Sequence, residues 1–473
     1  MATIGERLGG ALEREAPTWG IRRVPDEHRR FSGLDLAILW GDLSVGLLVL
    51  VTGAFLVPAL GFPRALFAIL LGTGVGCVPL ALVGLAGARE GVPTMVLFRA
   101  VLGLRGSYLA SALNLMQLLG WTAVEFWAMG QVANVASRRM FGLDAYHLWL
   151  GIVAIVCTVL AVGGPILVVR RWLERFGIYV LIGTAAWITF RAVATADLGA
   201  IWGGPGEGGL PFWLAVDLVI VMPISWLPLA ADYNRFARRD ARAFAGTYWG
   251  YFVGNAWFYG LGALLVLGAG AAADVVGIGV AIVSVAGGSL LLAALLVGES
   301  DNAFADIYSS AVSVQNVAPE APQRALIAVL GAVAFGLALF LSMDRYILFL
   351  SLIGSVFVPL FGVFAADYFV LRRGRYLEDE LFARERAQIH WRGLVPWAAG
   401  ILMYQWSVAP GGFPAWWTDA MGTFFHAWLH LPFPLFDGAW GASLPSVVVA
   451  FALGLLLPRS RTPLSAGERP PAG

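Results

Sequence analysis

The sequence predicts an all-α integral membrane protein with twelve transmembrane helices. Of its 473 residues, 59% are hydrophobic and 13% are charged, and the mean hydropathy is +0.77. Soluble proteins average about 45–50% apolar and about 25% charged residues. A water-soluble protein with such a surface would precipitate, and a disordered chain needs many more polar residues. The composition therefore places the chain in a lipid bilayer.

Twelve stretches are apolar and long enough to form helices of about 20 residues that cross the hydrocarbon core. They lie at 34–60, 65–88, 106–136, 147–169, 173–195, 211–231, 246–272, 277–300, 323–343, 345–371, 394–409 and 440–458. We expect a charged loop at 374–392, an aromatic, proline-rich loop at 410–439 and a disordered tail from Pro458. Residues 1–30 are charged and lack the apolar core of a signal peptide.

The arginines predict the orientation, because cytoplasmic loops carry an excess of basic residues. All 31 basic residues are arginines. With the amino terminus inside and twelve crossings, the arginines that fall outside are Arg64, Arg138, Arg139, Arg191 and Arg345. We therefore expect a multi-pass protein of the inner membrane with both termini in the cytoplasm.

In the first predicted helix, Asp42 lies at membrane depth between Gly41 and Gly46. A charge at that depth costs about 2.5–3.5 kcal/mol on insertion scales, so a charged residue there indicates a partner or a functional site. Glycine weakens a helix, so a break is expected here, and the carbonyls of an unwound turn can bind a cation. We assign Gly41 and Ser44 to a candidate cation site and Asp42 to a candidate substrate site. The alternative is a packing glycine with Asp42 near a cytoplasmic vestibule.

The third predicted helix carries a polar stripe. Spacings of three and four residues place four side chains on one helical face: Asn114, Gln117, Trp121 and Glu125. An aromatic plate beside a hydrogen-bonding carboxyl group suits a flat heterocycle, so Gln117, Trp121 and Glu125 are candidate substrate ligands. The alternative is a stripe packed against another helix, with Trp121 in the ordinary core.

The sixth predicted helix contains two prolines five residues apart, Pro223 and Pro228. Each removes a backbone donor, and such breaks are tolerated at membrane depth where they line a cavity. Trp226 lies between them and is therefore a candidate for substrate contact. The alternative is a simple kink.

The eighth predicted helix ends in the densest polar cluster of the chain. One stripe with spacings of three and four contains Glu299, Asn302, Asp306, Ser309 and Ser313. Ser300 and Asp301 face a neighbouring direction. In the alternative interpretation, the helix ends at Val297 and the cluster is a solvent loop. Apolar residues alternate with the stripe and favour the helix: Phe304, Ile307, Tyr308, Ala311 and Val312.

The polar clusters fall in helices 1, 3, 6 and 8, which would correspond in two repeats of five helices. Broken first helices and polar third helices in matching positions are typical of an inverted-repeat transporter. The predicted organisation is a cytoplasmic segment at 1–33, repeats at 34–195 and 211–371, a cytoplasmic loop with helices 11 and 12 at 372–458, and a disordered tail at 459–473.

Three motifs are distinctive: 91–95 (GVPTM), 120–125 (GWTAVE) and 231–236 (ADYNRF). They resemble motifs of the nucleobase–cation symporter 1 family, which includes cytosine, hydantoin and allantoin permeases. The stretches 225–233 (SWLPLAADY) and 301–309 (DNAFADIYS) are most similar to its hydroxymethylpyrimidine branch, which is linked to thiamine supply. The resemblance covers roughly 20–410. It implies a LeuT-like fold of five plus five helices with two extra helices, and a substrate site between helices 1, 3, 6 and 8.

The resemblance also implies roles for single residues. The stacking tryptophan of the family corresponds to Trp121, its polar partner to Glu125, and its substrate-binding residue on helix 8 to Asp306. The sodium-binding positions of sodium-coupled members correspond to Ser300 and Asp301. The helix 6 aromatic of the family corresponds to Pro223, which is a departure, and Trp226 would replace it.

Two positions that are amides in hydantoin-type members are carboxylates here, Glu125 and Asp306. A carboxyl group can pair with the amine and ring nitrogen of a 4-aminopyrimidine, whereas an amide suits a neutral imide. The acids therefore favour an aminopyrimidine over uracil or allantoin. The coupling ion stays open between Na+ and H+. Asp301 could bind sodium with Ser300, but Glu299, Asp301 and Asp306 lie within two turns and can share a proton.

We therefore expect a secondary active transporter that imports a hydroxymethylpyrimidine-like aminopyrimidine with a cation and needs no other cofactor. The alternatives are a permease for cytosine, another purine or pyrimidine base, hydantoin, allantoin or thiamine, and a passive channel or sensor. An enzyme is disfavoured, because the five histidines are scattered and Cys77 and Cys157 lie in apolar runs without a metal motif. The net charge of +1 argues against a nucleic-acid partner.

Overall fold

The computed structural model describes residues 19–164, 177–341, 346–382, 388–408, 415–434 and 439–457. In these ranges the chain forms helices joined by turns, and an isolated β-bridge links Phe31 to Ala237. The expected all-α class is therefore confirmed for the described residues. The predicted tail at 459–473 lies outside them, as do 165–169 and 173–176 of the fourth and fifth predicted helices.

The α-helices are α2 (Gly33–Asp42), α3 (Leu47–Leu60), α4 (Phe62–Glu90), α5 (Thr94–Leu102), α6 (Leu104–Phe141), α7 (Tyr146–Gly163), α9 (Ile178–Thr195), α10 (Leu198–Gly203), α11 (Phe212–Ser225), α12 (Ala230–Asn234), α13 (Asp240–Ala269), α14 (Val275–Ser284), α15 (Gly288–Val317), α16 (Gln323–Ala338), α17 (Tyr346–Ala365), α18 (Glu378–Phe382), α19 (Trp391–Ser407), α20 (Ala415–Gly422) and α21 (Ser443–Leu456). A 3-10 turn (Leu227–Leu229) joins α11 to α12, and π-helical turns follow α17 and α20.

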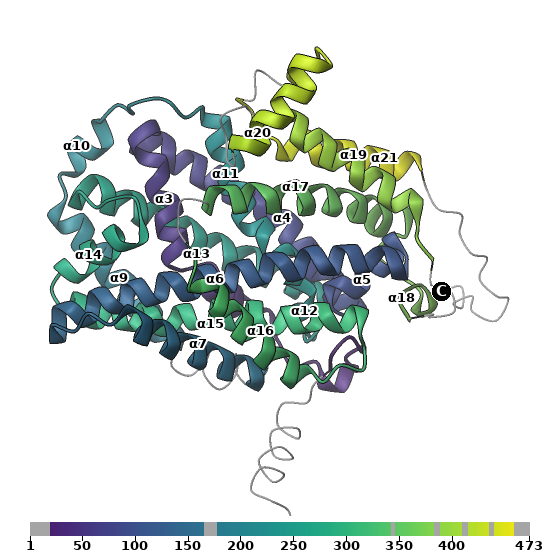
Figure 1. The fold of residues 1–473 in the computed structure, drawn as a ribbon, viewed down its shortest axis with the longest axis horizontal. Coiled ribbons are helices and arrows are strands. Elements are labelled where there is room, and N and C mark those ends of the chain that lie inside the picture. Colours follow the sequence, from purple (N-terminus) through teal and green to yellow (C-terminus); the bar gives the residue numbers. More distant parts are fainter. Residues whose placement is uncertain are drawn as a thin grey trace, which may run out of the picture.

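The long helices pack lengthwise into a bundle. The helices α6 and α15 lie side by side along the length of the molecule, and α13 packs against α2, α3 and α4 (Figure 1). The helices α17, α19 and α21 form a separate group along one side (Figure 1). The short helices α10 and α14 lie at one end of the bundle, while α5, α12 and α18 lie at the other (Figure 1).

Length and composition alone qualify six of the described helices as membrane spans, or seven if α2 and α3 count as one bent span. The chain is therefore a multi-pass membrane protein. The number of twelve crossings stays a prediction. Among the remaining helices, α15 carries a long run of polar residues, and α16 and α21 are shorter than a full crossing requires.

The predicted break in the first span is confirmed. A capping box starts α2, since the Asp35 amide donates to Ser32 Oγ (3.2 Å) and the Ser32 amide donates to Asp35 Oδ2 (2.8 Å). The helix ends at Asp42, and α3 continues from Leu47 at an angle of 63°. Residues 43–46 between them leave backbone groups outside any helix, in the position where carbonyls and amides can serve a ligand.

Glycines on α13 let this helix approach both halves of the bent span. A Cβ atom at Gly250 would lie 2.3 Å from the carbonyl oxygen of Ala37 in α2. A Cβ atom at Gly262 would lie 1.9 Å from the carbonyl oxygen of Leu50 in α3. No side chain fits at such distances, so backbone packs directly on backbone, as small residues allow in membrane helix pairs.

The break in the sixth span is milder than the break in the first. The helix α11 ends at Ser225, and the 3-10 turn that contains Pro228 leads into α12. The stretch Phe212–Asn234 nevertheless remains one span. The prolines therefore interrupt the hydrogen-bond ladder without producing the sharp bend seen between α2 and α3.

The predicted bounds of the eighth helix, 277–300, are wrong. Two helices replace it, α14 and α15, and the turn between them contains Gly287 with a φ of 76°. The helix α15 extends to Val317, so the alternative that ended it at Val297 is also wrong. Hydropathy stays high across the turn, which is why the sequence shows no boundary there.

Two other expectations need correction. The predicted loop at 410–439 contains α20 and a π-helical turn at Thr423–Trp428. The residues Thr94–Leu102, which we assigned to no helix, form α5, a short buried helix between α4 and α6. Both helices are too short to cross a bilayer, so the count of expected spans does not change.

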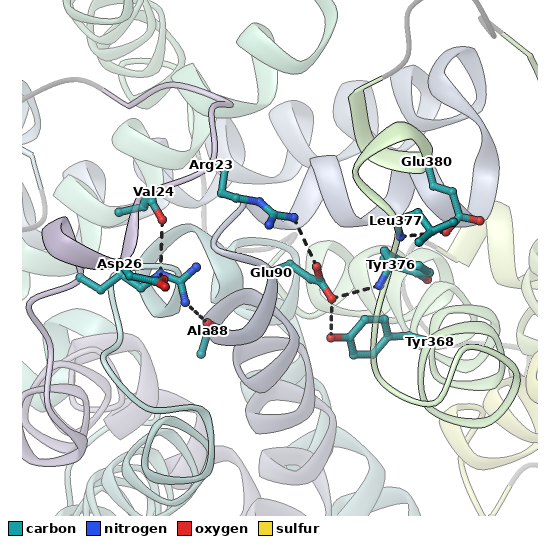
Figure 2. Close-up of polar contacts among 10 residues, drawn as sticks. Arg23, Val24, Asp26, Ala88, Glu90, Tyr368, Tyr376, Leu377 and Glu380 are labelled. Atoms are coloured by element: carbon teal, nitrogen blue, oxygen red, sulfur yellow. Dashed lines mark hydrogen bonds and ion pairs between the residues drawn. The ribbon is translucent and has the colours of Figure 1, made fainter. Parts of the chain in front are cut away.

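A buried carboxylate joins three separate segments at the end of α4 (Figure 2). Glu90 accepts hydrogen bonds from the hydroxyl of Tyr368 and the amide of Tyr376, both at 3.1 Å. The guanidinium of Arg23 lies 3.6 Å from the second carboxylate oxygen. Nearby, Arg29 donates to the carbonyl of Ala88 (2.9 Å). The amino-terminal segment, α4 and the segment after α17 are thereby tied together at this end of the bundle.

We expect the Glu90→Ala variant to unfold at a lower temperature than the parent protein. The substitution removes the acceptor of the buried Tyr376 amide, which costs about 1–3 kcal/mol. Thermal unfolding in detergent measures the effect. The Tyr368→Phe variant is the control, since it removes one of the two hydrogen bonds and should lose less. An unchanged unfolding temperature for Glu90→Ala would contradict this structural role.

Candidate functional site

The candidate site is a pocket at the break of the first span. Elements α6, α11 and α15 and residues 43–49 surround it. Its lining residues are Leu43, Gly46, Leu48, Val49, Trp121, Glu125, Met222, Ser225, Trp226, Glu299, Asn302 and Asp306. The cavity is narrow, about 20 Å³. Sites for small molecules usually measure several hundred cubic ångströms, so the lining elements must separate for a ligand to enter.

The stripe on α6 forms one wall. Trp121 and Glu125 line the pocket and are buried. Gln117 lies one turn away, and its Nε2 donates to Asn114 Oδ1 (2.8 Å) and to the carbonyl of Ser225 (3.3 Å). Gln117 therefore positions the wall against α11 and does not line the pocket itself. The ring of Trp121 packs edge-to-face on Phe349 of α17, with centroids 5.3 Å apart.

The stripe on α15 forms the opposite wall. Glu299, Asn302 and Asp306 all line the pocket, as their common face predicted. Asp306 lines the pocket from α15 and Glu125 lines it from α6. Further along the two helices, Asn114 donates to Ser313 Oγ (2.8 Å). The two polar stripes therefore face each other, so the acids of both helices meet in one chamber.

The chain around the break is held by α15. The amide of Leu47, the first residue of α3, donates to Glu299 Oε2 (2.9 Å). Asn302 Nδ2 donates to the carbonyl of Val45 (3.4 Å). Gly46 lies between these contacts, and a Cβ atom there would lie 2.7 Å from Glu299 Oε2. The carboxylate thus fits against the break because residue 46 has no side chain.

The candidate cation ligands lie beside the pocket and do not line it. Ser300 and Asp301 are buried on α15, and Ser300 Oγ donates to the carbonyl of Leu296 (3.0 Å). Ser44 Oγ donates to the carbonyl of Gly41 (2.7 Å), and both oxygens lie against Gly254 of α13, where a Cβ atom would be 2.0 Å from Ser44 Oγ and 2.7 Å from the carbonyl oxygen. Asp42, which we assigned to the substrate, is also outside the lining and lies within electrostatic reach of Asp301 and Glu299. Its neighbours therefore group it with the cation candidates.

Trp226 completes the aromatic part of the pocket. It follows α11 directly and lines the pocket, and its ring meets Trp40 of α2 edge-to-face, with centroids 6.3 Å apart. Trp40 is held in turn by a hydrogen bond from its Nε1 to Asn234 Oδ1 (2.8 Å). The second broken span thus delivers a fixed aromatic side chain to the pocket, at the position where we expected one.

Several lining residues were absent from the predicted site. Glu299 and Asn302 belong to the polar stripe that the spacing predicts but not to the predicted site, and their shared face with Asp306 is the signal that could have placed them there. Ser225 and Met222 had no signal beyond their closeness to Pro223. Elsewhere, in the described part of the chain, no three His, Cys, Asp or Glu side chains are arranged to hold a resident metal ion.

Two kinds of sequence comparison match most of the chain. A family model described as permease for cytosine/purines, uracil, thiamine, allantoin matches residues 23–426. The hydantoin permease of Microbacterium maritypicum is 24% identical over 399 residues, which cover 79% of each protein. The cytosine permease of Escherichia coli (strain K12) is 29% identical over 366 residues, which cover 75% of this chain and 81% of the permease.

Solved structures share the fold. Mhp1, a nucleobase-cation-symport-1 family transporter in a closed conformation with bromovinylhydantoin bound, aligns with a TM-score of 0.76 and 18% identity over 93% of this chain and 94% of Mhp1. A Na+-coupled sialic acid symporter in an outward-open state aligns with a TM-score of 0.62 and 12% identity over 94% of this chain and 93% of the symporter. At these identities the alignments establish the helical architecture.

Proposed function

Because the chain belongs to the family of permeases for cytosine/purines, uracil, thiamine and allantoin, we propose that it imports an aminopyrimidine together with a cation. The proposed substrate is a hydroxymethylpyrimidine-like compound of the kind that supplies thiamine synthesis, and the cation is Na+ or H+. The proposed location is the inner membrane, with both termini in the cytoplasm, in keeping with the distribution of the arginines.

One observation carries the choice of substrate. Two buried carboxylates, Glu125 and Asp306, face the same pocket as the indole of Trp121. A 4-aminopyrimidine presents an amine donor next to a ring nitrogen, and a carboxyl group can pair with this edge through two hydrogen bonds. The indole would stack on the flat ring. An imide such as hydantoin presents carbonyl acceptors on both sides of one ring N–H, and a carboxylate can pair only with the N–H, so the imide fits less well.

The proposed mechanism is alternating access between two repeats, 34–195 and 211–371, with the helices of 372–458 outside them. Helices 1, 2, 6 and 7 would move against helices 3, 4, 8 and 9 around the pocket. The broken first span and the meeting of the stripes on α6 and α15 support this division, because binding sites of such transporters lie where broken helices meet the repeat interface. The cation would bind beside the pocket, near Ser44 and Asp301.

We expect the Trp121→Leu variant to bind the aminopyrimidine about 5- to 150-fold more weakly, because stacking on an aromatic side chain is worth about 1–3 kcal/mol per base. Competition against a labelled ligand in detergent measures the affinity. The Trp121→Phe variant keeps an aromatic face and should recover part of the loss. Equal affinity in the leucine variant would remove Trp121 from the site.

Uptake into proteoliposomes tests the proposed function. Labelled hydroxymethylpyrimidine, cytosine, hydantoin and thiamine are offered separately, with a sodium gradient or a proton gradient imposed alone. Accumulation of hydroxymethylpyrimidine above its external concentration under one of the two gradients is the expected result. Equilibration without accumulation would indicate a passive channel. Accumulation of hydantoin or thiamine alone would refute the aminopyrimidine assignment.

Cytosine is the second candidate substrate. It carries the same amine beside a ring nitrogen, and the relative from Escherichia coli is a cytosine permease. Both compounds would use the same contacts with Glu125 and Asp306. The hydroxymethyl group distinguishes them, so the ratio of their uptake rates in the proteoliposome experiment decides between the two.

A further inference from the structure

We propose that Glu299 fills an anion site at the start of α3 with the carboxylate of the protein itself, so that the transporter takes neutral or positively charged heterocycles and rejects those that carry a carboxylate. The inference rests on the proposed function for the identity of the ring. It goes beyond that function by assigning the charge class of the substrate to one side chain.

The first amides of a helix have no acceptor within the helix and carry a partial positive charge. In α3 the first residue is Leu47, and its amide donates to Glu299 Oε2 (2.9 Å). Glu299 is 3% exposed and comes from α15, far away in the sequence. The carboxylate therefore occupies the position at which this half-helix would otherwise attract an anion.

The local backbone is shaped around this carboxylate. A Cβ atom at Gly46 would lie 2.7 Å from Glu299 Oε2 and 2.9 Å from Oε1, so a larger residue would displace the carboxylate. Asn302, one turn along α15, donates to the carbonyl of Val45 on the other side of Gly46. The two α15 side chains thus bind the residues directly before and after Gly46, so the carboxylate is a fixed part of the pocket wall.

In transporters with broken helices, such half-helix ends commonly face anionic groups of the substrate. Here the Glu299 carboxylate already occupies the amino-terminal end of α3. Among the described residues, no Arg, Lys or His lines the pocket. Glu125 Oε2 is buried in the same pocket, where the described residues supply no hydrogen-bond donor to it. A substrate carboxylate would meet three acids and no compensating charge, whereas an amine would meet acceptors.

The experiment compares two ligands that share one 4-aminopyrimidine ring. One carries a 5-hydroxymethyl group and the other a 5-carboxylate. Their affinities are measured for the full-length protein in detergent and for the Glu299→Ala and Glu299→Gln variants. The Asp217→Ala variant is the matched control, since Asp217 also accepts backbone amides at the start of a helix, from Ala442 (3.0 Å) and Ser443 (3.2 Å), but does not line the pocket.

We expect the parent protein to bind the carboxylate compound much more weakly than the hydroxymethyl compound. The Glu299→Ala variant should gain affinity for the carboxylate by roughly tenfold, the size of a favourable charge interaction at a partly buried helix end. The Asp217→Ala variant should gain none. Equal affinity of the parent protein for both ligands, or no gain in Glu299→Ala, would overturn the inference.

A second readout does not depend on the ring. Added formate should raise the unfolding temperature of Glu299→Ala by entering the vacated position, whereas formamide, which is neutral, should not. The Glu299→Gln variant keeps an acceptor oxygen and should respond less. Without a formate effect, the claim of a filled anion site fails. If neither pyrimidine binds the parent protein but formate acts, the proposed substrate is wrong and the anion site stands.

Discussion

Replacing Glu125 by glutamine should weaken binding of a 4-aminopyrimidine by about 10- to 150-fold, because a hydrogen bond to a charged partner is worth about 1.5–3 kcal/mol. Glu125 lines the pocket together with Asp306 and lies one turn from Trp121. The amide keeps the size of the side chain but turns one acceptor into a donor that opposes the amine of the substrate. Competition binding in detergent measures the change.

The same variant should shift the preference of the pocket toward imides such as hydantoin, which offer carbonyl acceptors to an amide donor. The amount of the variant protein in the membrane and its unfolding temperature are the controls for folding. The Glu125→Asp variant keeps the charge and should retain more aminopyrimidine affinity than the glutamine variant. Unchanged uptake of every pyrimidine by Glu125→Gln would exclude this residue from the substrate site.

Replacing Asp301 by asparagine should raise the cation concentration for half-maximal uptake by about tenfold or more, since a ligand charge is lost. Asp301 is buried on α15 and within electrostatic reach of Asp42 at the break. Substrate preference should change little, because neither residue lines the pocket. Uptake measured against sodium concentration and against pH, in separate series, identifies the ion whose dependence is lost.

The Asp217→Asn variant is the matched control for this prediction. It removes a different buried carboxylate, which lies on α11 and accepts amides of the segment that starts α21. We expect it to keep the ion dependence of the parent protein. If the Asp301→Asn variant shows the same coupling as the parent protein, Asp301 does not belong to the cation site, and Ser44 and Gly41 would need another partner.

The site residues that could be predicted from the sequence are the carboxyl groups, because placing a charge in the bilayer costs free energy. Glu125 and Asp306 stand at helical spacing with other polar residues, and acids at that depth require partners. The spacing predicted a polar face on each helix, and the family resemblance implied that the two faces share one substrate site. The break in the first span was visible because Gly41 and Gly46 flank Asp42. Each of these signals is local, so a single sequence contains it.

Other features depend on tertiary contacts or on turns that hydropathy does not register. The role of Glu299 depends on the amide of Leu47, which lies 252 positions earlier in the chain. No spacing rule connects the two. The turn at Gly287 interrupts a stretch that is apolar on both sides, so hydropathy predicts one continuous helix there. The same limit applies to α20, whose aromatic residues suggested a loop.

The glycine contacts of α13 bear on how this protein can move. Gly250 holds one half of the bent span and Gly262 holds the other, each at backbone contact distance. A change of the angle between α2 and α3 at residues 43–46 would separate one of these two helices from α13. The bent first span, α2 to α3, therefore moves as one rigid body with α13. The movement that admits a substrate has to occur where this body contacts α6 and α15.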